Sequence, residues 1–402
     1  MPPPRRRNGS SKRSASPPTA TSSACRPAIR TISMTGPIAE RIISPRIRRL
    51  KVVPPQVKPP DPGPLHPVRS LHLNESPFPP APSVVEAMQH AAARINRYPD
   101  HDGGELVRAL SARTGVAAER IVIGAGSNEL LYASADIVLD PGHEAIAPHP
   151  GFPTYEKAIS MRGGTYVGVP VRDDGSVDIA ATLAAVTPKT RLVFVASPHN
   201  PTGGMLAKAY IERLVYELPD DVLLHFDEAY YEFGRHAGGV ETLPILERRR
   251  GPWIATRSFS KAYGLAGIRV GYGLTNAREL ADAYRKVRVN FSVNAVALAG
   301  ARAALDAGSH MQALLDHTAA ERRRLAAALE GIGFEALPSA ANFLTVRTPK
   351  PAPALAAALR EENIFVLPFP WPGTPGAIRI TIGSSEDTDA VAAAMARLLK
   401  AL

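Results

Sequence analysis

Cysteine is nearly absent from this chain of 402 residues, which contains Cys25 alone. A single cysteine excludes a disulfide framework and a cysteine-based metal cluster, and it fits a reducing compartment such as the cytoplasm. No metal site is expected. The chain also lacks any uncharged apolar run of about eighteen residues, the length that a membrane-spanning helix needs. With 45% hydrophobic residues it can still bury a sizeable core, which favours a large soluble enzyme.

Acidic residues are scarce at the N-terminus, and this scarcity accounts for the whole net charge of +10. Residues 1–51 contain twelve arginines and lysines against Glu40, a net charge of +11, so residues 52–402 carry a net charge of −1. A basic surface spread over the fold would indicate a nucleic-acid partner. The nearly neutral remainder gives no reason to expect one.

Residues 1–52 are predicted to form a basic, disordered tail. Up to about residue 33 the tail is rich in serine, proline and arginine, and it cannot bury enough apolar surface to offset the entropy of ordering. Its composition is that of an organellar transit peptide, but a clear amphipathic helix is lacking. Translation from Met34, which opens a more ordinary N-terminus, is the alternative.

An N-terminal arm that joins a smaller domain is predicted for residues 53–96. Prolines are frequent in residues 53–82, and because X-Pro peptides disfavour helix, this part should run extended over a surface. An amphipathic helix is predicted at residues 83–94, with Ser83 as its N-cap, and a second helix at residues 104–113.

Short apolar runs, bounded by turn residues and separated by helical patterns, fill the predicted large domain, residues 97–293. Such runs predict an α/β fold with a mostly parallel sheet covered by helices on both faces. Residues 294–402 predict a smaller α+β domain with strands near residues 343–346 and 378–382 and a closing helix at residues 387–399. The seven strands predicted for the large domain are residues 121–123, 145–148, 165–169, 192–196, 222–226, 253–256 and 270–274.

The strongest signal for chemistry is S-F-S-K-A-Y-G at residues 258–264, directly after a predicted strand. A lone lysine after a strand usually lies on the surface, because lysine is rarely buried unless it is paired or reactive. Here Ser258 and Ser260 precede Lys261, and Arg269 follows it. Two small hydroxyl side chains and a guanidinium beside a lysine suit an anionic phosphate.

Three further motifs lie at the ends of predicted strands. N-P-T-G at residues 200–203 is by itself most simply a turn, and D-E-A-Y at residues 227–230 is by itself an acidic strand end. In open α/β sheets, however, ligands are contacted at the carboxyl ends of strands. G-A-G-S-N-E at residues 124–129 would present the backbone N–H groups of residues 126–128 at a helix N-terminus. It lacks the third glycine of a dinucleotide fingerprint, which favours a phosphate cup.

In order and spacing these motifs resemble the class I and II aminotransferases, which bind pyridoxal 5′-phosphate (PLP) in a fold type I structure. The likeness runs from about Leu73 to the C-terminus and is greatest to the histidinol-phosphate aminotransferase branch. That branch also shares L-N-E-S-P at residues 73–77, R-Y-P at residues 97–99 and I-R-I-T-I-G at residues 378–383. The resemblance implies a homodimeric PLP enzyme that moves the amino group of an amino acid to a 2-oxo acid.

The same resemblance implies roles for individual residues. Lys261 would form the Schiff base with PLP and move a proton, and Asp227 would keep the pyridine nitrogen protonated. Arg379 would hold the substrate α-carboxylate with its planar fork, near Asn200. The other implied cofactor contacts are Asn200 and Tyr230 to the ring oxygen, Phe152 to the ring face, Gly126, Ser127, Asn128, Ser258, Ser260 and Arg269 around the phosphate, and Tyr98 of a neighbouring subunit at the phosphate.

One departure concerns the far end of the substrate. The histidinol-phosphate branch usually carries an arginine in a V-R-P-like segment, where this chain has V-L-P with Leu367, and its arm tyrosine has only Pro54 and Pro55 as counterparts. Leu367 and three aromatic neighbours predict an apolar distal pocket, so we expect an apolar or aromatic amino acid to be preferred over histidinol phosphate. The neighbours are Phe365, Phe369 and Trp371.

Three alternatives stay open at this point. The first is a histidinol-phosphate aminotransferase. The second is a PLP decarboxylase or other lyase, because fold and cofactor do not fix which bond at Cα breaks. The third is a non-enzymatic regulator, which would need a DNA-binding helical module that the proline-rich residues 1–70 do not offer.

We predict that deletion of residues 1–33 changes neither PLP binding nor kcat, because these residues are expected to lie outside the fold. The measurement compares PLP titrations and kcat of the full chain with those of a chain that begins at Met34. A loss of solubility or activity in the shortened chain would show that the tail is structural.

Overall fold

The computed structural model describes residues 43–50 and 67–401. Most of the predicted tail, and the first part of the predicted arm with Pro54 and Pro55, lie outside these residues. Ahead of the main fold the structure describes one short helix, α2 (Pro45–Arg48).

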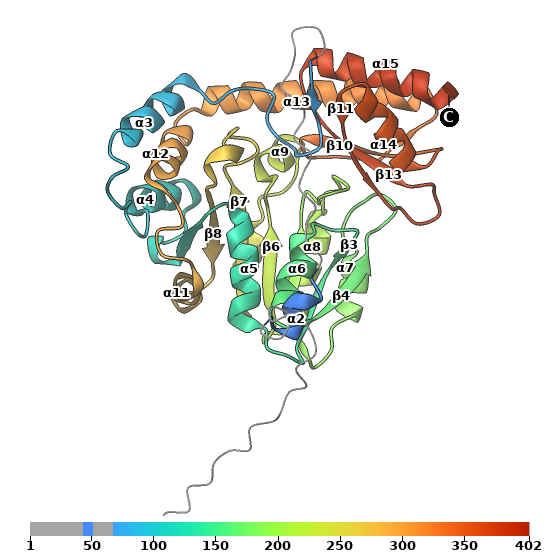
Figure 1. Ribbon diagram of the computed structural model, residues 1–402. Helices are drawn as coiled ribbons and strands as arrows, with labels where there is room; N and C mark the ends of the chain where they lie inside the picture. Colours follow the sequence, from blue (N-terminus) through green and yellow to red (C-terminus); the bar gives the residue numbers. More distant parts are fainter. Residues whose placement is uncertain (1–42, 51–66, 402) are drawn as a thin grey trace, which may run out of the picture. The chain divides into compact units, whose positions relative to one another are not determined.

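A seven-stranded sheet forms the centre of the fold, in the order β2-β8-β7-β6-β5-β3-β4 (Figure 1). Only β8 runs antiparallel to its neighbours β2 and β7, and every other pair in this sheet is parallel. The predicted α/β class and mostly parallel sheet are confirmed. The strands are β2 (Ile121–Gly124), β3 (Glu144–His149), β4 (Thr165–Pro170), β5 (Thr190–Ala196), β6 (Leu223–Asp227), β7 (Trp253–Ser258) and β8 (Gly271–Thr275).

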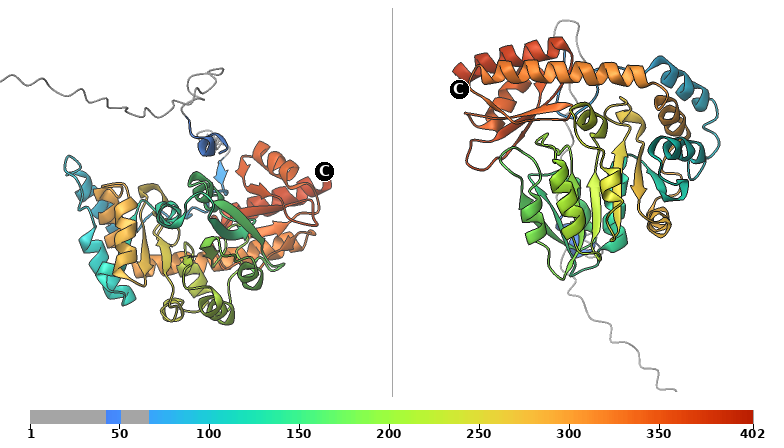
Figure 2. Two further views of the ribbon diagram at one scale, coloured as in Figure 1. Left: turned by 90° about the horizontal axis from the view of Figure 1, so that it is seen from below. Right: turned by 180° about the vertical axis from the view of Figure 1, so that it is seen from behind.

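Helices cover both faces of this sheet, as the continuous apolar strands require (Figures 1 and 2). Successive side chains of a strand point to opposite faces. In β5, Val193 and Val195 pack in one hydrophobic cluster, whereas Leu192 and Phe194 pack in another. The first cluster includes side chains of α7 (Ile179–Ala184), α8 (Lys208–Glu217) and α10 (Leu243–Leu246), and the second includes α5 (Ser127–Val138) and α6 (Thr154–Met161).

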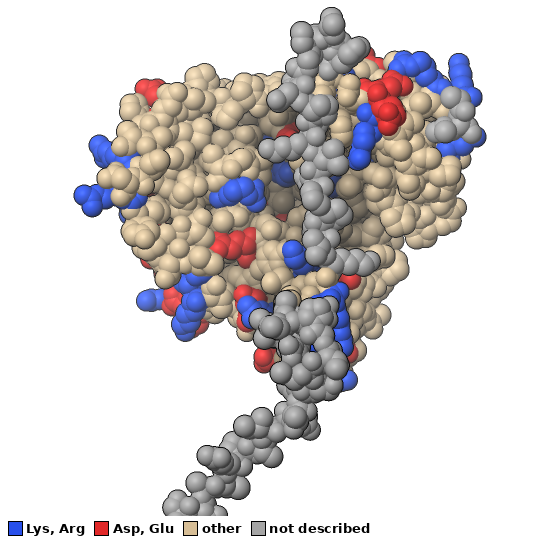
Figure 3. All heavy atoms as spheres, in the orientation of Figure 1, with Lys and Arg blue, Asp and Glu red and all other residues tan. Residues whose placement is uncertain are grey.

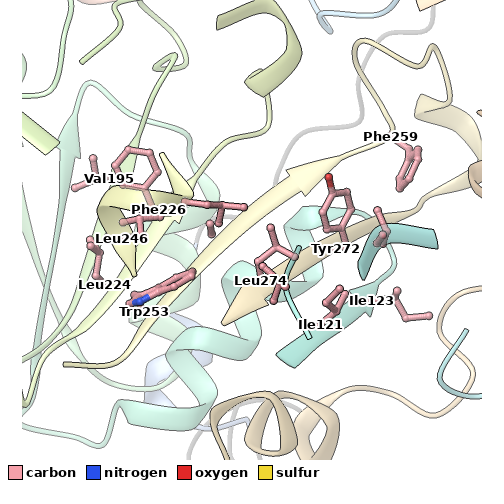
Figure 4. Close-up of a cluster of buried hydrophobic side chains, with 14 of the residues drawn as sticks. Ile121, Ile123, Val195, Leu224, Phe226, Leu246, Trp253, Phe259, Tyr272 and Leu274 are labelled. Carbon is pink, nitrogen blue, oxygen red and sulfur yellow. The ribbon is translucent and has the colours of Figure 1, made fainter. Parts of the chain in front are cut away.

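Large side chains between the sheet and its helices fix the central strands against one another. Phe226 of β6 and Trp253 of β7 are fully buried and lie in the cluster that Figure 4 shows, together with Leu224 and Leu246. Because Phe226 is the residue before Asp227, this packing also fixes the end of β6 from which Asp227 extends.

A smaller antiparallel sheet has the order β12-β13-β10-β9. Its strands are β9 (Glu335–Ala336), β10 (Phe343–Arg347), β12 (Leu367–Phe369) and β13 (Ala377–Thr381), and its apolar face packs on α13 (Gly308–Glu330), α14 (Ala352–Glu361) and α15 (Ser385–Ala401). The strands and closing helix predicted here correspond to β10, β13 and α15. A separate parallel pair joins β1 (Arg69–Ser70) to β11 (Ile364–Phe365). The domain limits at residues 53, 97 and 294 stay predictions.

The predicted N-cap at Ser83 is wrong. Helix α3 (Pro82–Ala92) has Ala81 at its N-cap, without a side-chain hydrogen bond, and Ser83 lies inside the first turn. Pro82 starts the helix one residue earlier, because its fixed φ and missing N–H suit the first helical position. The other helices nearby are α4 (Gly104–Thr114), α11 (Arg278–Val287) and α12 (Ala295–Ala304).

Charged side chains are interspersed over the face that Figure 3 shows, with basic and acidic residues side by side. Within residues 43–50 and 67–401, no helix combines the length and hydropathy that crossing a membrane requires. In the same residues, no three His, Cys, Asp or Glu side chains are grouped so that they could hold a metal ion.

Candidate active site

A cavity of about 710 Å³ lies at the carboxyl ends of β5, β6 and β7, which end at Ala196, Asp227 and Ser258. Parallel strands bring these ends to one edge of the sheet, where open α/β sheets bind ligands. The structure brings most of the residues predicted from sequence into this cavity. They are Ser127, Asn128, Phe152, Asn200, Asp227, Tyr230, Ser258, Ser260, Lys261, Arg269 and Arg379.

The turn between β2 and α5 forms one wall of the cavity. Gly126 has φ +76°, and a Cβ at this position would lie 2.6 Å from Nη2 of Arg269, so a side chain would collide with the guanidinium. Glu129 holds the turn in place, because its Oε2 accepts from Ala125 N at 2.6 Å and from Ser292 Oγ at 3.0 Å. The turn therefore presents the N-terminus of α5, with Ser127 as its first residue, to the cavity.

The segment after β7 adds hydroxyl groups and a cation to the same wall. Ser260 N donates to Ser258 Oγ at 3.1 Å, and Arg269 Nη1 donates to Ser260 Oγ at 3.3 Å. Arg269 itself has a left-handed backbone, with φ +57°. Free N–H groups of a helix, two hydroxyls and a guanidinium make a donor set that fits a phosphate group.

Asp227 presents a buried carboxylate at the end of β6. It accepts from Tyr155 Oη at 2.8 Å and from Ala229 N at 3.1 Å. Burial raises the pKa of Asp227 to about 6, although the hydrogen bond from Tyr155 opposes this shift. A carboxylate that loses hydration in this way favours a cationic partner, such as a protonated ring nitrogen, so the donor set fits PLP.

Lys261 lines the cavity. Its Nζ donates to the carbonyl oxygens of Leu73 and Asn74, both at 2.9 Å. Burial and, to a smaller extent, the positive charge of Arg379 lower the pKa of Lys261 to about 8. A lowered pKa raises the fraction of neutral amine, which is the form that attacks a carbonyl carbon.

Arg379 of β13 also lines the cavity, and two hydrogen bonds hold its guanidinium. Nη1 donates to Asn200 Oδ1 and Nη2 donates to the carbonyl oxygen of His72, both at 2.5 Å. The guanidinium carbon also lies 5.4 Å from the centre of the Phe343 ring. These contacts fix the plane of a fork that can bind a carboxylate with two hydrogen bonds.

Two predicted site residues lie outside the cavity within this chain. Tyr98 is 82% exposed, and its ring stacks on Phe291 with ring centres 4.6 Å apart. Leu367 is 37% exposed and does not line the cavity, but it lies directly across from Arg379 in the antiparallel pair β12–β13. Residues opposite each other in such a pair carry their side chains on the same face of the sheet.

The expectation that three aromatic neighbours of Leu367 line the distal pocket is not met by the cavity. Phe365 packs beside the ring of His72, at 6.0 Å between ring centres. Trp371 is buried with Phe369 in a small hydrophobic cluster. The physical reason is that each ring already packs against other residues: Phe365 lies in β11, which pairs with β1, and Phe369 and Trp371 pack against Leu337 and Ala377.

Sequence reasoning missed two polar residues of the site. Tyr155 is fully buried and donates to Asp227, and Asn74 donates to Tyr230. Asn74 stands inside the motif L-N-E-S-P, and Tyr155 lies three residues after the predicted site residue Phe152. A polar side chain close to other predicted site residues was the available signal. The hydrogen-bond partners of Tyr155 and Asn74, however, are 72 and 156 residues away along the chain.

A lysine, a buried carboxylate and a phosphate cup at one edge of a mostly parallel sheet define a fold type I PLP enzyme. The model of the family "Aminotransferase class I and II" matches residues 67–395. The chain therefore belongs to the class I and II aminotransferases.

Several known proteins are similar to this chain. An aromatic amino acid aminotransferase of Rhodococcus jostii is 42% identical over 321 residues, which are 80% of this chain and 87% of that protein. Histidinol-phosphate aminotransferase 1 of Mesorhizobium japonicum is 34% identical over 332 residues, 83% of this chain and 90% of that protein. The crystal structure of histidinol-phosphate aminotransferase from Sinorhizobium meliloti in complex with PLP has a TM-score of 0.81 and 30% identity, covering 92% of this chain and 100% of that chain.

These findings confirm an enzyme that uses PLP and moves an amino group from an amino acid to a 2-oxo acid. The predicted resemblance to the histidinol-phosphate aminotransferases is confirmed as well. Of the reactions left open by the sequence, aminotransfer is the one supported, ahead of a lyase or a regulator.

We predict that Asp227→Asn stabilises the apoprotein at pH 8 and not at pH 4. With its pKa raised from 3.8 to about 6, Asp227 contributes stability that is fully present below pH 4 and is lost as the pH rises through 6. The loss is roughly 3 kcal/mol when complete. Asparagine has no charge to bury, so the variant should gain in urea midpoint at pH 8 while its aminotransferase activity falls.

Asp316→Asn provides a control of opposite sign. Asp316 is exposed, and its hydrogen bond with His236 lowers its pKa, so the neutral variant should not gain stability at pH 8. Equal urea midpoints for Asp227→Asn and the unaltered chain at pH 8 would show that the buried carboxylate carries no such penalty.

Proposed function

We propose that this aminotransferase prefers an apolar or aromatic amino acid, and that Leu367 selects for it beside Arg379. The observation that carries the proposal is the register of β12 and β13, in which Leu367 lies directly opposite Arg379. A substrate whose α-carboxylate is bound by Arg379 would extend its side chain near this exposed leucine. Full burial of an apolar side chain contributes roughly 1.5 to 3 kcal/mol.

The positive charges of the cavity are already committed to other groups. Among the described residues that line it, the lysine and arginines are Lys261, Arg269 and Arg379. His72 also lines it, but burial lowers the pKa of His72, which keeps the ring neutral at pH 7. No cation among these residues is left for a second phosphate, and a dianion without a partner costs several kcal/mol to bury.

Arg347, another candidate partner for a substrate phosphate, is engaged elsewhere. Its Nη1 donates to Glu335 Oε1 at 2.5 Å and its Nη2 donates to the carbonyl oxygen of Asp173 at 2.6 Å. Its guanidinium carbon lies 5.1 Å from the centre of the Trp371 ring.

The comparisons support an aromatic substrate through the Rhodococcus jostii relative and histidinol phosphate through the other two. Histidinol phosphate is therefore the second candidate. The leucine opposite Arg379 favours the first, because a leucine cannot donate a hydrogen bond to a phosphate oxygen.

The residues of the cavity would divide the work of holding PLP and substrate. The N-terminus of α5, with Gly126, Ser127 and Asn128, would bind the cofactor phosphate together with Ser258, Ser260 and Arg269. Asp227 would face the pyridine nitrogen, Phe152 would stack on the ring, and Asn200 and Tyr230 would bond its oxygen.

When bound, PLP withdraws electrons from the substrate Cα through its protonated ring. Lys261 would bond covalently to the cofactor in the resting enzyme, and its released amine would then move the proton at Cα. Asp227 supports this chemistry because a carboxylate favours the protonated ring nitrogen. Arg379 would orient the amino acid through its carboxylate.

We further propose a homodimer in which Tyr98 completes the active site of the partner subunit. Tyr98 is largely exposed and does not line the cavity of its own chain, which leaves it available to a partner subunit. Exposed apolar side chains gather near it on neighbouring segments and would be covered in a dimer. They are Ile95, Val289 and Phe291.

We predict a higher kcat/KM for phenylalanine and tyrosine than for histidinol phosphate. Leu367→Arg should raise kcat/KM for histidinol phosphate by about tenfold or more and lower it for phenylalanine, because a charged hydrogen bond contributes about 1.5 to 3 kcal/mol. Leu367→Met, which stays apolar, is the control and should leave the preference unchanged. An unaltered enzyme that favours histidinol phosphate by about tenfold would overturn the proposal.

A second prediction tests the shared site. Lys261→Ala and Tyr98→Ala chains should each be inactive or nearly so, and mixing them should restore activity, because a mixed dimer regains one complete site. Tyr216→Ala is the control: Tyr216 is 64% exposed on α8 and outside the cavity, so this change alone should leave activity intact. No restoration, once subunit exchange is demonstrated, would count against a shared Tyr98.

A further inference from the structure

Asn74 lines the cavity, and all of its polar groups are hydrogen-bonded. It is only 2% exposed. Its backbone N donates to Thr381 Oγ1 at 2.9 Å, and the Thr381 hydroxyl donates back to Asn74 Oδ1 at 3.1 Å. Its carbonyl oxygen accepts from Asn342 Nδ2 at 3.0 Å and from Lys261 Nζ at 2.9 Å.

The backbone of Asn74 is left-handed, with φ +56°. This region is uncommon for residues other than glycine, and asparagine is among the few that tolerate it. A buried residue held in such a conformation by surrounding contacts is a reason to look for a role in function. In this conformation the carbonyl oxygens of Leu73 and Asn74 both face Lys261 Nζ.

The side-chain amide of Asn74 also fixes the phenol of Tyr230. Asn74 Nδ2 donates to Tyr230 Oη at 2.8 Å. The other amide atom, Oδ1, accepts from the Thr381 hydroxyl, which leaves Nδ2 for Tyr230. An amide nitrogen only donates, so the phenol oxygen accepts, and its own proton must point elsewhere.

The direction left for that proton is the cavity, which Tyr230 lines. On one side the ring of Tyr230 packs edge-to-face on Phe343, at 5.3 Å between ring centres, and an aromatic ring edge offers no hydrogen-bond acceptor. Burial raises the pKa of Tyr230, while Arg379 and the hydrogen bond from Asn74 lower it. The phenol therefore keeps its proton at neutral pH and can donate it to a hydrogen bond.

We propose that Asn74 is a positioning residue for the aminotransfer reaction: its side-chain amide turns the Tyr230 hydroxyl proton into the cavity, toward the ring oxygen of PLP. The inference rests on the proposed role of Tyr230. Thr381 lies two residues after Arg379 on β13, with its side chain on the same face of the sheet. Asn74 thus connects the strand that would bind the substrate carboxylate to the phenol that would bind the cofactor.

Asn74→Gly removes the side-chain amide but keeps the left-handed backbone, because glycine adopts a positive φ freely. It therefore tests the amide apart from the backbone conformation. Asn363→Gly is a matched control. Asn363 has φ +60° and lies between α14 and β11, and it does not line the cavity. Three quantities are measured for each variant: the pH midpoint of the absorbance change of bound PLP, the Kd for PLP, and the melting temperature of the apoprotein.

Asn74→Gly should move the pH midpoint by about 0.4 to 1 pH unit, the size of one neutral hydrogen bond, in the same direction as Tyr230→Phe. In the Tyr230→Phe background it should add no further shift, because the group on which it acts is gone. Asn74→Gly should also raise the Kd for PLP. Asn363→Gly should leave the midpoint and the Kd unchanged, whatever it does to the melting temperature.

The possible failures are distinguishable. If Tyr230→Phe itself leaves the midpoint unchanged, the proposed role of Tyr230 is wrong. If Tyr230→Phe moves the midpoint and Asn74→Gly does not, or if the shift persists in the Tyr230→Phe background, the inference about Asn74 is wrong.

Asn74→Asp keeps the test valid should the glycine variant fail to fold. Aspartate also tolerates a positive φ and still accepts from Thr381, but its carboxylate cannot donate to Tyr230. Its charge adds a shift of its own, which remains when Tyr230 is replaced by phenylalanine. The shift in pH midpoint caused by Asn74→Asp should therefore be smaller in the Tyr230→Phe background than with Tyr230 present. An equal shift in both backgrounds overturns the inference.

Discussion

The parallel pairing of β5, β6 and β7 is the constraint on which the rest of the site depends. It brings the strand ends at Ala196, Asp227 and Ser258 to one edge of the sheet, and each following segment enters the cavity from there. The packing of Phe226 and Trp253 beneath that edge leaves the strands little freedom to slide. The site residues can therefore lie in loops and still be held in place, because the loops start from a rigid edge.

Burial in this cavity works against the charged forms of the residues that carry the chemistry. The pKa of Asp227 is raised to about 6 and that of Lys261 is lowered to about 8, and in both cases loss of hydration is the main cause. A cofactor with a cationic ring nitrogen and a reactive carbonyl group relieves both conditions. The apoprotein is therefore less stable than it would be without these buried groups, whereas the same groups are reactive when PLP is bound. Such a trade-off between stability and activity is common at active sites.

In the proposed function, the small antiparallel sheet would contribute substrate specificity through the register of β12 and β13. Pairing of β12 with β13 places Leu367 across from Arg379. In the proposed function Arg379 would bind the substrate carboxylate and Leu367 would lie near the substrate side chain. The same sheet anchors Asn74 through Thr381. Under these proposals, substrate choice and cofactor contact would be connected through β13.

Much of the fold and the cofactor site could be predicted from the sequence, because the decisive information there is local. Apolar runs predicted the strands, and the glycines, serines and prolines of the motifs predicted the turns that follow them. Lys261, Asp227 and Arg269 lie in these motifs and could therefore be predicted as candidate site residues. The family resemblance added Arg379 and Asn200, whose separation of 179 residues no local pattern covers.

What the tertiary structure alone decided depends on contacts between distant segments. Folding alone brings Tyr155 to Asp227 and Asn74 to Tyr230. It also places Phe365 beside His72 and packs Phe369 with Trp371, so none of these three rings lines the cavity. Hydrophobic periodicity and turn signals depend on residues that are neighbours in the sequence, so the sequence predicts them. Hydrogen-bond partners and side-chain packing depend on which distant segments come together in the folded structure.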